Sequence, residues 1–175
     1  MAFGTTGKLV SPERETVGEC IFFVYRRKHN RPWMCAEDIC SEMDLLSRKA
    51  YDIVQALAEY DEYVLEDCFN HTCLLVAERI EVSSPVRGTG AWKNLYFATM
   101  EKALLPVKHT PHEFFFKCFP LEFENKVTDE NRHEFNKAER GLKLFYSVHL
   151  NAERLAVPEH FGCYMKASVP DYLRR

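Results

Sequence analysis

The apolar residues in the first half of the chain recur at the spacing of amphipathic helices, and this pattern constrains the fold more than any other feature. After Ser11-Pro12-Glu13, which is typical of a helix start, one helical face collects Val17, Cys20, Ile21 and Val24. Similar sets predict a second helix over residues 36–43 and a third over residues 46–57. We therefore expect the chain to begin with three short helices.

Two strand-like runs follow the third predicted helix. Residues 63–67 and 72–76 are separated by four residues that suit a hairpin loop. Three helices and a hairpin within about 65 residues match the plan of a winged helix. In that plan the second and third helices form a helix-turn-helix and the hairpin is the wing. Winged helices bind either DNA or other proteins, so the plan leaves both functions open.

Charge is unevenly divided between the two halves of the chain. The net charge is −3, but residues 1–82 hold 9 Lys and Arg against 15 Asp and Glu, whereas residues 83–175 hold 14 against 11. At this boundary a segment rich in Ser, Pro and Gly predicts a linker over residues 83–90. We expect a winged-helix domain over residues 11–82. A small mixed α/β domain over residues 91–175 is expected to pack beside it or to mediate dimerisation.

The second half predicts two helices and one aromatic strand. Residues 91–105 form an amphipathic helical pattern, and a further helix is expected from residue 128 to about residue 149. The aromatic run over residues 113–123 is strand-like. Together with the first half, these elements predict an α+β fold that is mostly helical.

The third predicted helix carries a specific motif. Residues 47–57 are Ser-Arg-Lys-Ala-Tyr-Asp-Ile-Val-Gln-Ala-Leu. This segment resembles the recognition helix of the E-two-F/DP family of cell-cycle transcription factors, which carries Arg-Arg-x-Tyr-Asp. Arg48, Tyr51 and Asp52 match the motif, and Lys49 replaces its second Arg. The resemblance covers about residues 15–77. It implies a winged helix, sequence-specific binding of duplex DNA in transcription regulation, a homo- or heterodimer, and a nuclear location.

The resemblance also implies recognition of a G·C-rich site, and the chemistry of the motif agrees with it. The Arg48 guanidinium can donate two hydrogen bonds to guanine, whereas Lys49 keeps the positive charge without that bidentate geometry. Tyr51 can donate its hydroxyl to a phosphate, and Asp52 lies one helical turn from Arg48 and can orient it. The predicted DNA-binding residues lie on the outward face of this helix and in the basic run before the second helix: Arg48, Lys49, Tyr51, Asp52, Gln55, Arg26, Arg27, Lys28 and Arg31.

The same residues also have a purely structural interpretation. Arg48 and Asp52 have the spacing of an ordinary surface ion pair, and Tyr51 can be a partly buried core aromatic. The acidic balance of residues 1–82 opposes a phosphate backbone unless the basic residues share one face. The alternative function is therefore a winged-helix adaptor that binds protein and not DNA.

The sequence carries no catalytic or metal-binding signature. Cys68-x-x-His71-x-Cys73 and His109-x-x-His112-Glu113 bring candidate ligands close together, but neither has the spacing of a known zinc site. The sequence also lacks a Gly-rich phosphate loop and a nucleophile elbow. We therefore expect no enzyme activity, no cofactor and no metal, and seven cysteines that stay reduced.

Apolar runs in the sequence are short. The longest run of consecutive apolar residues, over residues 20–25, spans six residues, so none can cross a bilayer. The first residues lack the apolar core of a signal peptide. We expect a soluble intracellular protein that does not act at a membrane.

Overall fold

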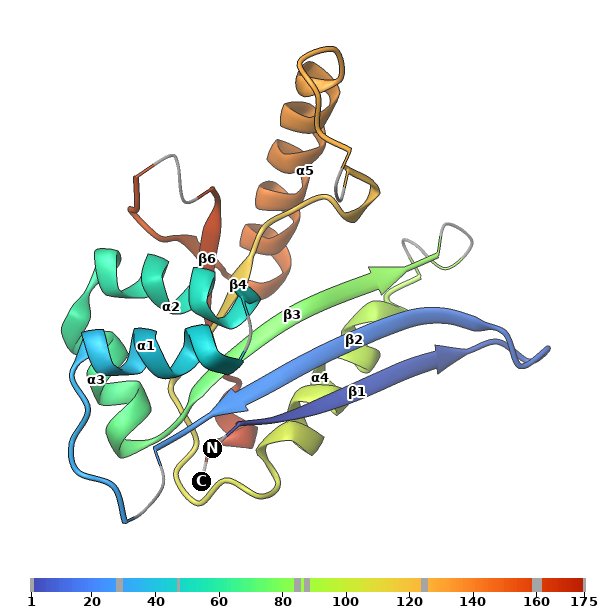
Figure 1. The fold of residues 1–175 in the computed structure, drawn as a ribbon. Helices are drawn as coiled ribbons and strands as arrows, with labels where there is room; N and C mark the ends of the chain where they lie inside the picture. The colour runs from blue at the N-terminus through green and yellow to red at the C-terminus, as the bar shows by residue number, and fades with distance from the viewer. Residues whose placement is uncertain are drawn as a thin grey trace.

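A mixed sheet of six strands organises the computed structural model, which describes residues 2–27, 30–46, 48–83, 86, 89–123, 126–158 and 162–174 (Figure 1). Its strand order is β1-β2-β3-β4-β6-β5. The strands are β1 Ala2–Val10, β2 Thr16–Tyr25, β3 Leu74–Val82, β4 Glu113–Lys117, β5 Glu153–Arg154 and β6 Tyr164–Ser168. The helices are α1 Ala36–Leu46, α2 Arg48–Tyr60, α3 Glu62–His71, α4 Ala91–Leu104 and α5 Arg132–Leu150, with short 3-10 helices η2 Leu121–Phe123 and η4 Asp171–Leu173.

The pairing of β3 with β4 joins the two halves of the chain. These strands are parallel, with Val76 opposite Phe115, whereas the other neighbouring strands are antiparallel. β3 precedes residues 83–90 in the sequence and β4 follows them. One sheet therefore contains strands from both sides of the predicted linker.

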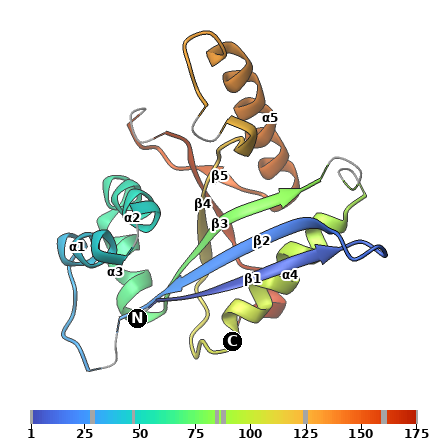
Figure 2. The same cartoon turned by 45° about the vertical axis from the view of Figure 1, so that its right-hand side comes forward.

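Helices cover both faces of this sheet. α1, α2 and α3 pack on one face, and α4 packs on the other together with the last turns of α5 (Figure 2). β4 shows the division clearly, because Phe114 and Phe116 belong to the core on the α4 face and Phe115 to the core on the α1–α3 face. The central strands are therefore buried on both sides, as their continuous apolar runs require.

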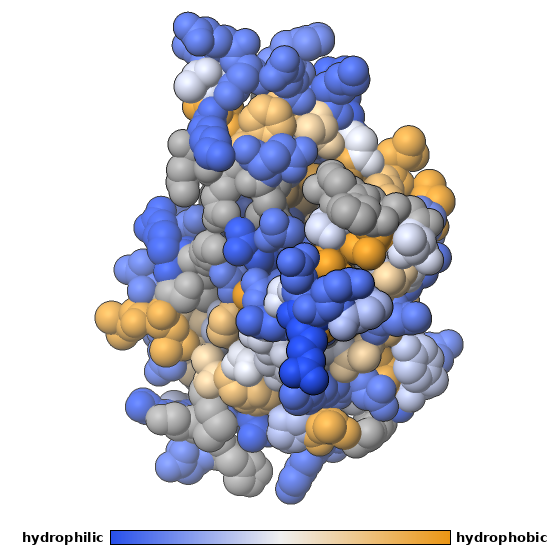
Figure 3. All heavy atoms as spheres, turned by 90° about the vertical axis from the view of Figure 1, so that its right-hand side faces the viewer, coloured by the Kyte–Doolittle hydropathy of each residue, from blue (hydrophilic) through white to orange (hydrophobic). Residues whose placement is uncertain are grey.

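One end of α5 packs on the core, and the other end extends beyond the sheet (Figure 1). The ring centroids of Phe145 and Trp92 are 4.9 Å apart, as are those of Tyr146 and Phe116. The protruding end, which begins at Arg132, lies at the top of Figure 3, where hydrophilic side chains dominate the visible face. Only the C-terminal half of α5 therefore joins the core on the α4 face.

The winged-helix prediction, and with it the mostly helical α+β class, is wrong. The segment predicted as the first helix forms the strand β2, and β1 pairs with it along its length. Residues 63–67, predicted as the first strand of the wing, lie in α3. The helices do not form a three-helix unit beside a hairpin, because they pack on a sheet that includes β4 and β6 from the second half.

The burial of β2 explains the first error. Cys20, Phe22 and Val24 are buried on one side of the strand, and the residues between them are partly buried on the other. Apolar residues therefore follow one another without clear alternation and imitate helical spacing. Ser11, expected to begin a helix, instead accepts a hydrogen bond at 2.9 Å from the backbone N–H of Arg14 in the turn between β1 and β2.

A side-chain cap explains the second error. The Asp61 carboxylate accepts hydrogen bonds from the backbone N–H groups of Tyr63 and Val64, at 3.0 and 3.2 Å, and so begins α3 where the sequence pattern favours a strand.

The other helices predicted from the sequence, and the aromatic strand, are present in the structure. Helices are confirmed as α1, α2, α4 and α5, and the aromatic run is confirmed as a strand over β4.

Two glycine substitutions test the packing of β1 on α4. A Cβ atom at Gly7 would overlap the buried Thr99 hydroxyl, which donates a hydrogen bond to the Leu95 carbonyl at 2.6 Å. Gly7→Ala should therefore lower the free energy of unfolding by about 1–3 kcal/mol. Gly141→Ala, at an open helical position in α5, should raise it by about 0.5–1 kcal/mol. Chemical denaturation of both variants measures these changes, and an unchanged stability of Gly7→Ala would contradict this packing.

Candidate functional site

Two adjoining cavities lie at one end of the sheet. Their volumes are about 780 and 500 Å³, and both are lined by His71, Thr72 and His109. The topology places them here: β2 ends, β3 and β4 begin and β6 ends at this edge, because β3 and β4 are parallel and their outer neighbours are antiparallel. We call the combined space the basic groove, after its cationic side chains and histidines: Arg26, Arg27, Lys108, Arg174, His71, His109 and His112.

The lining of the basic groove has one sign of charge. Four cationic side chains and three histidines line it, and none of its described lining residues is an Asp or Glu. Two carboxylates lie at its margin: Asp67 lies 3.9 Å from His71 Nε2, and Asp171 lies 3.0 Å from an Arg174 guanidinium nitrogen. A hollow with walls of one charge sign concentrates the potential and attracts anions.

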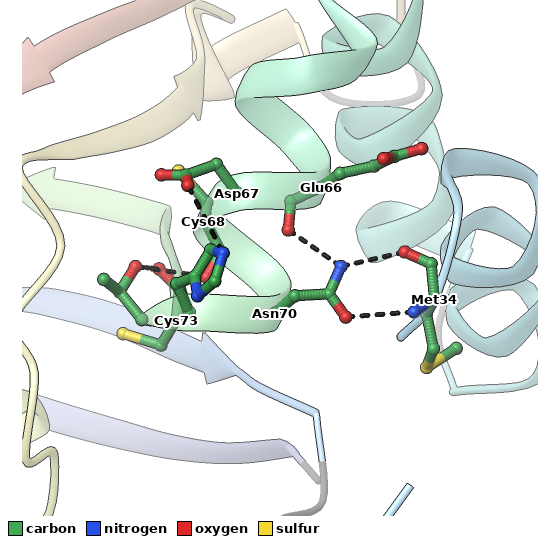
Figure 4. Close-up of polar contacts among 8 residues, drawn as sticks. Met34, Glu66, Asp67, Cys68, Asn70 and Cys73 are labelled. Carbon is green, nitrogen blue, oxygen red and sulfur yellow. Dashed lines mark hydrogen bonds and ion pairs between the residues drawn. The ribbon is translucent and has the colours of Figure 1, made fainter. Parts of the chain in front are cut away.

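Asn70 fixes the end of α3 that forms one wall of the groove. Its buried amide accepts a hydrogen bond from the Met34 backbone N–H at 3.0 Å and donates to the Met34 and Glu66 carbonyls at 2.8 and 2.9 Å (Figure 4). The Glu66 carboxylate also accepts from the backbone N–H of Ala36, at the start of α1. These bonds tie the segment before α1 to α3, so the wall of the groove is set by the packing of two helices.

The opposite margin is held by Arg27. Its backbone N–H donates to the Phe69 carbonyl at 3.3 Å, and its guanidinium donates to the Arg31 carbonyl at 2.6 Å. The first bond links the end of β2 to the end of α3. Arg31, the next described cation along the chain, is exposed beside the groove and does not line it.

An aromatic ring stands at the rim. The Trp33 side chain is 50% exposed, and its ring centroid lies 5.1 Å from that of His71 in an edge-to-face arrangement. A Trp ring combines a flat apolar face with a polar N–H, which is why Trp is enriched at binding interfaces. Trp33 therefore adds a flat apolar surface to a site whose other groups are cationic.

The structure separates the predicted DNA-binding residues into two groups. Arg26 and Arg27 line the basic groove, whereas none of the described side chains predicted on α2 does. Lys28 lies outside the described residues, as does the side chain of Lys49. The α2 prediction thus concerns a different surface from the groove.

On α2 the predicted residues interact with one another. Arg48 Nε lies 3.1 Å from Asp52 Oδ1, and the Arg48 guanidinium lies 5.0 Å from the centre of the Tyr51 ring. Asp52 also lies near Tyr164 of β6: burial, together with the Asp52 charge, raises the pKa of the Tyr164 hydroxyl to about 12. Arg48 and Asp52 therefore form the surface ion pair that their spacing allows, and contact of Arg48 or Gln55 with DNA stays a prediction.

Most residues of the basic groove were not predicted from the sequence. Lys108, Arg174 and Trp33 belong to no motif that the sequence predicts, and they meet only through the topology of the sheet. Arg26 and Arg27 are among the predicted DNA-binding residues, and His71, His109 and His112 belong to the two His-containing segments whose spacing does not match a zinc site. Within the described residues no group of three or more His, Cys, Asp or Glu side chains is placed to hold a metal ion.

The neighbouring cysteines are unsuited to ligation. Burial raises the pKa of the Cys68 and Cys73 thiols to about 12. Glu113, next to His112, pairs with Lys166 Nζ at 3.0 Å and does not line the groove. Protonated thiols are poor metal ligands, so the chemistry of the groove is that of its cations and imidazoles.

Comparison with protein-family models and with curated proteins gives no match to this chain. The resemblance of residues 47–57 to the E-two-F/DP family therefore stays a prediction, and the winged helix that it implies is not the fold observed. None of the helices in the described ranges has the length and apolar character needed to cross a membrane.

Asn70→Ala tests how the groove wall is held. The change leaves the buried N–H and carbonyl of Met34 without their partner, so the free energy of unfolding should fall by about 1–3 kcal/mol. Asn94→Ala, at an exposed position of α4, is the matched control and should change it by less than about 0.5 kcal/mol. Thermal unfolding of both variants measures the two changes. Equal stabilities of Asn70→Ala and Asn94→Ala would show that Asn70 does not hold the wall.

Proposed function

We propose that the chain binds nucleic acid, with backbone phosphates in the basic groove and a base on Trp33. The observation that carries this proposal is the combination of four cations and three histidines, with no carboxylate among the described lining residues, beside an exposed aromatic ring. Phosphates are the anions that Arg and Lys side chains bind best, and aromatic rings stack on exposed bases.

The geometry favours a single strand over a duplex. Bases can stack on Trp33 only when they are unpaired or at an end, whereas a duplex offers only its backbone and groove edges. The groove is formed by strand ends, loops and the last turn of α3, and α3 contributes to it only the end of the helix, not an exposed helical face of the kind that reads a duplex. Duplex DNA with a G·C-rich site, expected from the α2 motif, is the comparison ligand in the experiments below.

Because the chain as a whole is acidic, its affinity for phosphates must come from the basic groove alone. The net charge is −3 and acids dominate α1, where Glu37 and Asp38 occupy the first turn. Association therefore depends on the groove itself and not on the overall charge of the molecule. Binding should be weak in high salt, because each phosphate contact releases counterions from the strand.

The salt dependence of binding tests the phosphate contacts. A labelled single-stranded oligonucleotide should bind at low salt, with an affinity that falls steeply as salt rises. Lys108→Ala removes one groove cation, so the slope of log affinity against log salt should become shallower by about 0.7. Lys8→Ala, an equal loss of charge on the distant strand β1, should leave the slope unchanged.

Two further results of the same titrations separate the alternatives. If Arg48→Ala weakens binding of G·C-rich duplex while Lys108→Ala does not, DNA binds at α2 and the groove proposal fails. If no oligonucleotide binds at low salt, the chain is better explained as a protein-binding module, which needs no phosphate contact.

Trp33→Ala tests the stacking contact. Loss of one base–aromatic stack costs about 1–3 kcal/mol, so single-strand affinity should fall about 5- to 150-fold with little change in the salt slope. Tyr63→Ala is the control, because Tyr63 is 85% exposed at the far end of α3 from the groove. Fluorescence quenching of Trp33 by the oligonucleotide gives an independent measure of the stacking contact. Equal affinities of Trp33→Ala and Tyr63→Ala for the single strand would show that no base stacks on Trp33.

A further inference from the structure

Two buried cysteines face each other at the opposite end of the sheet from the basic groove. Cys118 follows β4 and Cys163 precedes β6, and the antiparallel register, with Lys117 opposite Tyr164, places them directly across from each other. The backbone N–H of Cys118 donates to the Cys163 carbonyl at 2.8 Å. Opposed residues of antiparallel strands have Cα atoms about 4.5–5.5 Å apart, within the range of about 4.4–6.8 Å for a disulfide. The strand pairing therefore holds the two Cα atoms at a separation compatible with a Cys118–Cys163 bond.

The two cysteines line a cavity with a cationic wall. The cavity has a volume of about 590 Å³, and one carboxylate, Glu139, faces five cationic side chains in its lining: Lys117, Arg132, Arg140, Lys143 and Arg154. Glu139 forms an ion pair with Lys143, whose Nζ lies 2.6 Å from the Glu139 carboxylate. The remaining cations give the cavity a positive potential, which stabilises a thiolate.

The two thiols are made unequal by their contacts. A contact between the two sulfurs, together with the Lys143 and Arg154 charges, lowers the pKa of Cys163 despite its burial. The same contact, with burial, raises the pKa of Cys118. By contrast, burial raises the pKa of the Cys20 thiol to about 12, as for Cys68 and Cys73. Because Lys143 and Arg154 line the same cavity as the two sulfurs, this difference favours Cys163 as the nucleophile and Cys118 as the second thiol.

We propose that Cys118 and Cys163 form a dithiol site that reduces hydroperoxides and closes to a reversible disulfide. The Cys163 thiolate attacks one peroxide oxygen and the O–O bond breaks. The leaving group takes a proton: hydroxide from hydrogen peroxide becomes water, and alkoxide from an organic hydroperoxide becomes an alcohol. Cys163 is then a sulfenic acid. The Cys118 sulfur attacks the Cys163 sulfur, the S–S bond forms, and the expelled hydroxide takes the Cys118 proton. Two thiols lose two electrons and the peroxide gains them.

This site is independent of the proposed nucleic-acid binding. It lies between the ends of β4 and β6 and the helix α5, and Cys118 Sγ also lies 4.0 Å from the Glu139 carbonyl of α5. No residue lining this cavity lines the basic groove. Each proposal can therefore fail without the other.

Peroxide treatment of the reduced full chain tests the proposal. Hydrogen peroxide should convert the protein to a form about 2 Da lighter, and dithiothreitol should restore the original mass. Proteolysis without reduction should yield one peptide pair joined through Cys118 and Cys163. Cys35→Ser, which removes an exposed thiol, is the control and should leave this bond unchanged. A pair joined through other cysteines, or no intramolecular bond, overturns the proposal.

Single variants separate the two roles. Cys118→Ser should stop the reaction at Cys163 sulfenic acid, which dimedone traps at that residue, whereas Cys163→Ser should leave Cys118 unlabelled. Lys143→Gln should slow labelling about tenfold for each unit by which the thiol pKa rises, and Lys137→Gln, outside the cavity lining, should not. Because a cysteine variant can fail to fold, dimedone competition on the wild-type chain provides a second test. Label on Cys118 instead of Cys163 contradicts the assignment.

Discussion

Burial of the sheet on both of its faces is the constraint on which the rest of the structure depends. Along β3, Leu75 and Ala77 enter the core on the α4 face, and Leu74 and Val76 enter the core on the α1–α3 face. A strand with apolar side chains on both sides is stable only when both faces are covered. The helices inserted between β2 and β3 supply one cover, and α4, inserted between β3 and β4, supplies the other (Figure 2).

The same topology determines where chemistry can gather. Because β3 and β4 are parallel, the connections that enter them meet at one end of the sheet and bring residues from four distant parts of the sequence into the basic groove. At the other end, β4 leaves and β6 enters, which places Cys118 opposite Cys163. The two candidate sites are thus separated by the length of the sheet, and each is built from loops supported by buried strands.

The sequence predicts local structure here better than it predicts architecture. Helical spacing correctly located α1, α2, α4 and α5, because each has one apolar and one polar face. It failed for β2, where burial on both sides removes the alternation that marks a strand, and for α3, where the Asp61 cap outweighs a strand-like composition. Arg26 and Arg27 could be selected as a basic run, but Lys108 and Arg174 reach the groove only through the parallel pairing of β3 with β4, which no local pattern encodes.

Backbone chemical shifts of the labelled chain, recorded during titration with a single-stranded oligonucleotide, test the central claim most directly. Binding in the basic groove should move the amide signals of Arg26, Arg27, His71 and Lys108 and the indole signal of Trp33, while those of Arg48 and Gln55 on α2 stay in place. Shifts confined to α2, or no shifts at low salt, would contradict the account.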